Sequence, residues 1–241
     1  MTSIERQVRW LRMYAVGSSA VLLILVASAF APRRFPTIDV ERINVRNADG
    51  SLALALAGRG RLPAPMLDGK SFPASLSEGR TTTAGMIFFN ESGDEVGGMI
   101  WGGHKTPGGY EAGEHLSFDQ WKNDQVVTID YLDDGKSSRS GLGIIDRPRD
   151  LPLSEVIALT SALDSATGAR HDSLQRRVDS LDAAGKFGRS RIFLGSENRV
   201  ATLRMKDMQG HERIRMVVDT ANVARLEFLD EKGAVIARYP R

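Results

Sequence analysis

Hydrophobic side chains follow three different patterns along the chain of 241 residues. The first is a run of twenty uncharged residues, Met13–Pro32, with Arg12 before it and Arg33 and Arg34 after it. A helix of that length rises about 30 Å, the thickness of the hydrocarbon core of a bilayer. The pattern predicts a transmembrane helix at Met13–Pro32, preceded by a short basic tail at residues 1–12.

A cleaved signal peptide is the alternative interpretation of this run, since Ala27–Ala29 is a small-residue sequence of the kind that precedes cleavage. The run is long for a signal peptide, and Pro32 disfavours cleavage after Ala31, so a retained anchor is favoured. Basic residues are balanced on its two sides, so the positive-inside rule does not orient it. The short basic tail favours an extracytoplasmic domain, and we expect a single-pass protein of a bacterial inner membrane.

Four small residues in this run form a possible contact surface for another transmembrane helix. Small side chains let two helix backbones approach closely within a bilayer. The predicted packing residues are Gly17, Ser18, Ser19 and Ala20.

The second pattern is an alternation of apolar and polar residues that recurs around a turn of the form Asn/Asp-x-x-Gly or its shorter variant Asp-Asp-Gly. Asn or Asp accepts backbone hydrogen bonds at the start of such a turn, and Gly adopts the left-handed conformation that closes it. The pattern predicts five β-hairpins: Ile43–Leu56, Gly85–Trp101, Thr128–Ile144, Ala201–Val218 and Ala224–Tyr239. Because the spacing of the turns is unequal, it favours an antiparallel sheet or open barrel over a propeller.

The third pattern has a helical period and lies between the third and fourth hairpins. Val156, Ile157 and Leu163 fall on one helical face, and Leu174, Val178 and Leu181 on a second, which predicts an αα-hairpin. It either lies on the sheet or serves as a free arm for a partner. The expected fold is mainly β with this helical insert: hairpins at 33–150, the insert at 151–185, and hairpins at 186–241 that complete the same domain.

Composition excludes several classes of function. Lys and Arg total 32 against 30 for Asp and Glu, and the two signs are interspersed, which argues against a nucleic-acid-binding surface. The chain has no cysteine, so it has no disulfides, thiolate metal sites or cysteine nucleophile.

The glycine-rich segment Gly97–Gly113 is the most unusual local composition. It lacks the contiguous Gly-Lys-Ser/Thr of a phosphate loop, because His104 separates Gly103 from Lys105, so we expect a mobile glycine-rich hairpin loop. No carboxylate stands at metal-ligand spacing with His104 and His115, and His171 and His211 are expected at ordinary solvent-exposed positions. We therefore predict no metal, cofactor or catalytic residue.

Large aromatic residues are concentrated between residues 88 and 131. Such residues either fill a core or anchor a protein interface. On the second interpretation, Trp101, Tyr110 and Trp121 are the predicted partner-binding residues.

The late segment LRMKDMQGHERIRMVVDTANVARLEFLDEKGAVIARYP resembles the repeats of a loose group of bacterial single-pass membrane proteins with Asp/Asn-x-x-Gly hairpins and no assigned activity. The resemblance covers Ile43–Leu56, Gly85–Ile144 and Ala201–Tyr239. It implies an anchored, β-rich domain and no functional residues.

Three hypotheses of function follow from these observations. The first is a non-catalytic, membrane-anchored accessory or structural subunit that binds and stabilises neighbouring proteins of a respiratory, photosynthetic or transport complex. The second is an anchored ligand-binding or envelope-sensing domain that uses Gly97–Gly113. The third is a hydrolase whose Ser, His and Asp come from distant parts of the chain.

Overall fold

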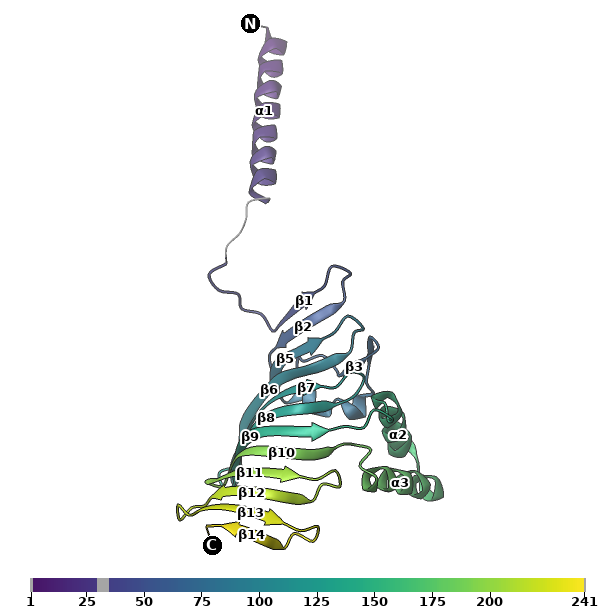
Figure 1. Cartoon of the computed structure of the whole chain (residues 1–241). Coiled ribbons are helices and arrows are strands. Elements are labelled where there is room, and N and C mark those ends of the chain that lie inside the picture. The colour runs from purple at the N-terminus through teal and green to yellow at the C-terminus, as the bar shows by residue number, and fades with distance from the viewer. Residues whose placement is uncertain (1, 30–34, 241) are drawn as a thin grey trace. The chain divides into compact units, whose positions relative to one another are not determined.

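The computed structural model describes residues 2–29 and 35–240, which divide into two compact units, one within residues 1–40 and one within residues 41–241. The first unit contains helix α1, Ser3–Ala29 (Figure 1). Its segment Ser3–Ser28 is long and apolar enough to cross a membrane. The helix contains the predicted packing residues, Gly17, Ser18, Ser19 and Ala20.

Helix α1 begins at Ser3 rather than at the predicted Met13. The backbone N–H of Thr2 donates to Glu5 Oε2 at 2.8 Å, and the Glu5 N–H donates to Thr2 Oγ1 at 3.4 Å. This reciprocal pair caps the first turn, so the expected basic tail is mostly helical. The end of the predicted span, Phe30–Pro32, and the basic residues Arg33 and Arg34 lie outside the described residues.

The second unit is built on a sheet of twelve strands that follow one another in chain order, every neighbour antiparallel. The sheet is an open meander with β1 and β14 at its edges, not a closed barrel (Figure 1). The strands are β1 Arg42–Arg46, β2 Leu52–Ala57, β5 Ala84–Phe89, β6 Glu95–Thr106, β7 Gly109–Asp119, β8 Gln125–Asp133, β9 Ser138–Asp146, β10 Arg189–Glu197, β11 Val200–Lys206, β12 Glu212–Val218, β13 Ala224–Leu229 and β14 Val235–Tyr239.

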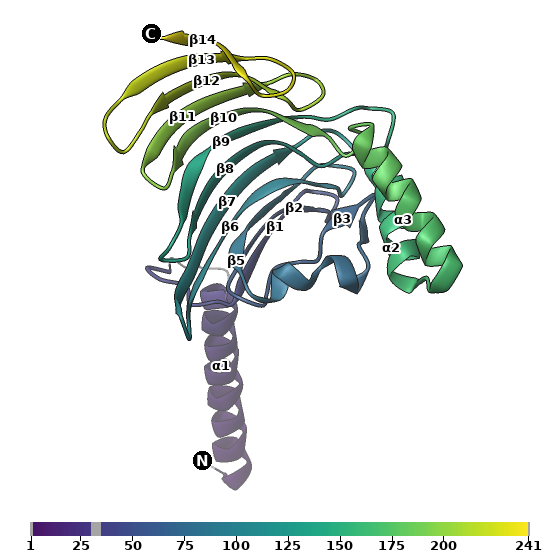
Figure 2. The ribbon, with the colours of Figure 1, turned by 90° about the horizontal axis from the view of Figure 1, so that it is seen from below.

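Two insertions leave this order unchanged. The connection from β2 to β5 contains the small hairpin of β3 Met66–Leu67 and β4 Lys70–Ser71, followed by the short 3-10 helices η1 Ala74–Leu76 and η2 Glu78–Thr81. The connection from β9 to β10 contains the predicted helical pair, α2 Leu153–Ser165 and α3 Gly168–Ala183. Figure 2 shows β3, α2 and α3 on the same side of the curved sheet.

The five predicted hairpins are present in the sheet. The last turn shows how they close: Asp230 Oδ1 accepts hydrogen bonds from the N–H groups of Lys232 and Ala234 at 2.9 and 2.8 Å, and Gly233 has φ +80°. A carboxylate at the first position and a left-handed residue at the fourth are what this turn requires.

The sequence pattern missed four further hairpins of the large sheet, because their turns contain no Asn/Asp-x-x-Gly sequence. In the β12–β13 turn, Asp219 is the first residue and Asn222, with φ +62°, takes the place of glycine. In the β10–β11 turn, Asn198 and Arg199 both have positive φ, the geometry of a two-residue hairpin turn.

The prediction of a mobile loop at Gly97–Gly113 is wrong, because most of this segment belongs to β6 and β7. Two of its glycines, Gly97 and Gly98, are required by close approach of the backbone. A Cβ atom on Gly97 would lie 2.2 Å from the Ser117 carbonyl oxygen, and one on Gly98 would lie 2.6 Å from the Met86 carbonyl oxygen. Glycine therefore lets neighbouring strands pass closely here.

The apolar core lies at the N-terminal end of the sheet. Its buried members are Ala55, Ala57, Leu62, Ile87 and Phe89. Met66, from the insertion after β2, packs against them. We call the side of the sheet that carries Ala55, Ile87 and Phe89 the packed face, and the opposite side the open face.

Substitution Gly195→Ala tests the close approach of strands across β9 and β10. A Cβ atom on Gly195 would lie 2.1 Å from the Ser140 carbonyl oxygen, so we expect the free energy of unfolding to fall by about 1–3 kcal/mol. Gly108→Ala is the control, because a Cβ atom there meets nothing within 4 Å. Chemical denaturation followed by circular dichroism measures both, and equal stabilities of the two variants would contradict the prediction.

Candidate functional site

The open face carries two continuous rows of apolar residues that cross the whole sheet. Residues paired across neighbouring strands lie side by side, and alternate residues of a strand share a face. The first row is Ile43, Leu56, Met86, Met99, Leu116, Ile129, Leu142, Leu194, Leu203, Met216, Leu226 and Tyr239. The second is Val45, Leu54, Phe88, Gly97, Phe118, Val127, Ile144, Ile192, Met205, Ile214, Phe228 and Ala237. Each row takes one residue from each of the twelve strands, and neither contains a charged residue.

Many side chains in these rows are exposed to solvent. The exposed fraction is 50% for Ile129, 53% for Leu194 and 48% for Met216. The others exposed by more than a third are Ile43, Val45, Leu56, Met99, Phe118, Met205 and Tyr239. Isolated apolar residues are common on protein surfaces, but an uninterrupted apolar band marks an interaction surface.

The packed face changes from apolar to charged toward the C-terminal strands. One register row crosses this face from β2 to β14: Ala55, Ile87, Gly98, Ser117, Thr128, Gly143, Phe193, Arg204, Arg215, Glu227 and Arg238. The strands β11–β14 thus pair charged residues on their packed face and present apolar residues on the open one.

Glu227 is the centre of the charged part of this row, with 3% of its side chain exposed. Arg215 Nη2 donates to Glu227 Oε2 at 2.5 Å, and Arg238 Nε donates to Oε1 at 2.8 Å. The hydrogen bond from Arg215, against the opposing effect of burial, lowers the pKa of Glu227 below its usual value of 4.5. These acids and bases satisfy one another on the packed face, while the apolar side chains of β11–β14 remain on the open one.

A shallow groove of about 450 Å³ follows the open face over the C-terminal strands. Its walls include Leu194, Leu203, Met216, Leu226 and Tyr239, all members of the first row. The groove is therefore the C-terminal part of the apolar band, and an apolar partner surface fits it.

The predicted aromatic residues are only partly brought together. Trp101 lies on the open face of β6, where it pairs with Glu114, and Tyr110 lies on the open face of β7. Trp121 lies in the β7–β8 turn, beyond the other end of β7. Tyr131, which is not among the predicted partner-binding residues, pairs with Glu114 on the side opposite Trp101. The hydroxyl groups of Tyr131 and Tyr110 both donate to Asp133, at 3.1 and 2.9 Å respectively.

The histidines do not form the dispersed triad of the hydrolase hypothesis within the described residues. His115 Nδ1 lies 2.6 Å from Asp130 Oδ1 on the packed face, the arrangement of a base and its orienting acid. The neighbouring hydroxyl, Thr128 Oγ1, donates to Asp130 at 2.9 Å instead of to the histidine. His115 Nε2, where a nucleophile belongs, has no hydrogen-bond partner in the described chain.

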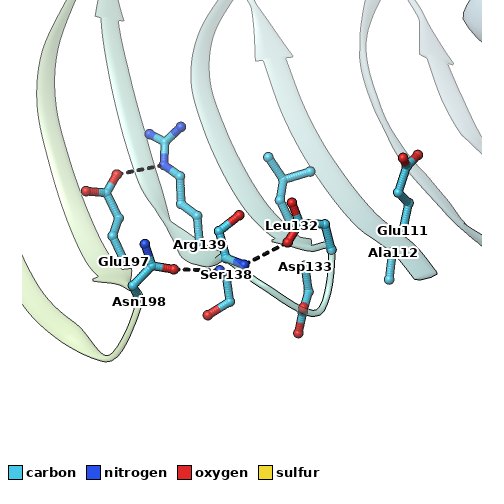
Figure 3. A pocket seen from close by; sticks show the side chains of 10 residues that line it. Glu111, Ala112, Leu132, Asp133, Ser138, Arg139, Glu197 and Asn198 are labelled. Atoms are coloured by element: carbon cyan, nitrogen blue, oxygen red, sulfur yellow. Dashed lines mark hydrogen bonds and ion pairs between the residues drawn. The ribbon is translucent and has the colours of Figure 1, made fainter. Parts of the chain in front are cut away.

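A hollow of about 500 Å³ lies at the end of the sheet where β7 to β10 meet their turns (Figure 3). Arg139 Nε pairs with Glu197 Oε1 at 3.3 Å, and the Ser138 N–H donates to Asn198 Oδ1 at 2.8 Å. These four polar groups are therefore paired with one another.

Comparisons of the chain with protein-family models, with curated proteins and with solved structures found no match.

Substitution Glu227→Gln tests the charged row by its pH dependence. A carboxyl group whose pKa is lower in the folded state than in the unfolded state stabilises the fold at pH values above its unfolded-state pKa. This contribution is lost as the pH falls through the folded-state pKa. At pH 7 we expect the variant to be about 1–3 kcal/mol less stable. The difference should shrink below about pH 4.

Denaturation curves at both pH values measure this difference. Glu231→Gln, in the exposed β13–β14 turn, is the matched control. A Glu227→Gln penalty that stays the same at low pH would rule out this role for the carboxylate.

Proposed function

We propose that the protein is a non-catalytic, membrane-anchored subunit whose open face binds a second copy of the chain. The proposal rests on one observation: two uncharged apolar rows on the open face cross all twelve strands. Helix α1 serves as the anchor, as its length and composition allow. Placement of the domain on the extracytoplasmic side of a bacterial inner membrane stays a prediction.

The size of the apolar band supports a protein partner. Twelve strands at about 4.8 Å spacing give rows about 55 Å long, and two rows with their side chains are about 14 Å wide. The band thus covers roughly 750 Å². A stable interface buries about 800 Å² on each partner, so one sheet-sized partner accounts for the whole band.

The chemistry of the band supports a second copy as that partner. A partner must present an uncharged surface of similar length, and the same rows on another copy provide it, because a two-fold interface joins one patch to itself. Sheets bury an apolar face against a second layer, commonly another sheet about 10 Å away. Two chains anchored in one bilayer also meet at a raised effective concentration.

Single-cysteine crosslinking tests this pairing in the full chain in its native membrane. The chain has no cysteine, so each introduced thiol is unique. Ile129 lies on β8, near the middle of the band, and we expect Ile129→Cys with a short bismaleimide to give a product of twice the 26.4 kDa chain. Lys136→Cys, in the exposed β8–β9 turn, is the control and should give little of it. Products that contain a different protein, or no excess over Lys136→Cys, would refute the pairing of two copies.

A charged residue in the band should separate the two copies. Met216 and Met208 are both exposed methionines, but Met216 lies on the open face of β12 and Met208 in the β11–β12 turn. We expect Met216→Glu to reduce the Ile129→Cys crosslink at least about tenfold, because a buried unpaired carboxylate disfavours the interface. Met208→Glu should leave the crosslink unchanged, and an equal effect of the two variants would contradict the assignment of the open face.

A further inference from the structure

A second hollow lies on the other side of the sheet from the proposed interface. It has a volume of about 270 Å³ and is lined by α2, by the insertion between β2 and β5, and by the ends of β6, β7 and β8. Its apolar wall includes Met66, Phe72, Leu76, Leu153, Val156 and Ile157. We call this hollow the α2 cavity.

Hydrogen bonds fix the helical insert over the α2 cavity at both of its ends. The Leu153 N–H, at the start of α2, donates to the Lys122 carbonyl oxygen at 3.1 Å. The Arg147 guanidinium donates to the carbonyl oxygens of Gln125 and Phe187, each at 2.7 Å. Phe187 follows α3, so one arginine joins both ends of the insert to the start of β8.

The polar wall of the cavity carries more negative than positive charge. Arg80 pairs with Glu95 at 2.5 Å, and Arg147 pairs with Asp124 at 2.8 Å. Asp119 also lines the cavity, and among the described residues it has no ion-pair partner. Three acids and two bases leave one uncompensated negative charge, which belongs to Asp119.

Three buried polar atoms at this wall lack hydrogen-bond partners in the described chain: Asp119 Oδ1, Glu95 Oε2 and Arg80 Nη1. Buried polar groups in folded proteins are nearly always paired with protein groups, water or a ligand, so these unpaired atoms mark where a bound molecule can be held beside the cavity. The two carboxylate oxygens are acceptors, and the group that satisfies them is a donor.

The environment of Asp119 disfavours its charge when the cavity holds no cation. Burial and the nearby carboxylates of Asp124 and Glu95 raise the pKa of Asp119 to about 7, against the opposing effect of Arg147 and Arg80. Burial, opposed by Arg80, also raises the pKa of Glu95. Burial, which penalises the charged form of a carboxyl group, is the main cause of both pKa shifts.

We propose that the α2 cavity binds a small primary alkylammonium ion, with the ammonium group donating to Asp119 and Glu95 and the alkyl chain against α2. An ammonium group supplies three donors and the compensating positive charge. The volume lies just below the range of about 300–1,000 Å³ for sites of drug-sized ligands, so the ligand is small. This site is independent of the proposed pairing through the open face.

Two other occupants of the α2 cavity are less consistent with its lining. A metal ion requires several ligands around one point, and the described residues contain no cluster of three or more acids or histidines able to hold one. A proton shared between Asp119 and Glu95 satisfies the two oxygens without a ligand but leaves the apolar wall unused. Ligand-binding measurements distinguish a metal ion or a shared proton from the proposed alkylammonium ion.

Ligand-observed NMR with the full chain in lipid nanodiscs tests the proposal, with empty nanodiscs as background. The probes are butylammonium, neutral butan-1-ol and anionic butyrate, which share an alkyl chain and differ in the head group. We expect saturable binding of butylammonium only. Its affinity should increase from about pH 6 to about pH 8, because Asp119 loses its competing proton while an alkylammonium keeps its charge.

Asp119→Asn is the decisive variant, because it removes the uncompensated charge and should not lower stability. We expect it to weaken butylammonium binding about 10- to 100-fold, with an unchanged or higher melting temperature. Asp164→Asn, on the exposed side of α2, makes the same chemical change away from the cavity and should alter neither. Equal binding of butan-1-ol, unchanged affinity in Asp119→Asn, or no saturable binding in the millimolar range would each overturn the proposal. A shared proton predicts the last of these results.

Discussion

The architecture of the second unit depends on the register of its antiparallel ladder. Every strand of the twelve-stranded sheet pairs with the strands that precede and follow it in that sheet, so each connection decides which side chains of the next strand face which way. A shift by one residue at any turn would move all later apolar side chains to the other face. The two apolar rows stay continuous from β1 to β14 because every turn preserves this alternation, including those where bulges interrupt the pairing, as at Asp119 and Lys206. Turn chemistry is therefore the constraint from which both faces follow.

Much of this fold could be predicted from the sequence, because its signals are local. An apolar run identifies α1, the turn between Asp230 and Gly233 identifies a hairpin, and the change of period after Leu151 identifies the helical insert. The predictions that failed have a common physical cause: the fold requires a particular backbone conformation or spacing at these positions and not a particular residue type. Asn222 adopts the left-handed conformation expected of glycine, and Gly97 lies within a strand because neighbouring strands approach closely there.

The candidate sites differ in how far the sequence could indicate them. The open face was accessible in principle, because alternation within each strand places Leu203 and Met205 on one side. Only the register of strand pairing shows that these residues continue rows from the other strands. A search for aromatic residues in the sequence therefore identified Trp101 and Tyr110 on the open face but not the apolar band. The α2 cavity was out of reach, since it joins Arg80, Asp119 and Val156 from three separate parts of the chain. Nothing local at Asp119 distinguishes it from the many acids that begin turns.

The strict chain order of the twelve strands has a further consequence for how such a domain forms and changes over evolution. Most neighbouring strands are joined by short turns, apart from the two insertions, so ordering can begin at several hairpins and spread along the sheet. The same connectivity makes each hairpin an additive unit, since a pair of strands appended beyond β14 needs no rearrangement of the preceding ones. Each added pair would lengthen the rows of the open face by about 10 Å. Duplication of a hairpin is thus a simple genetic route to a longer or shorter apolar band.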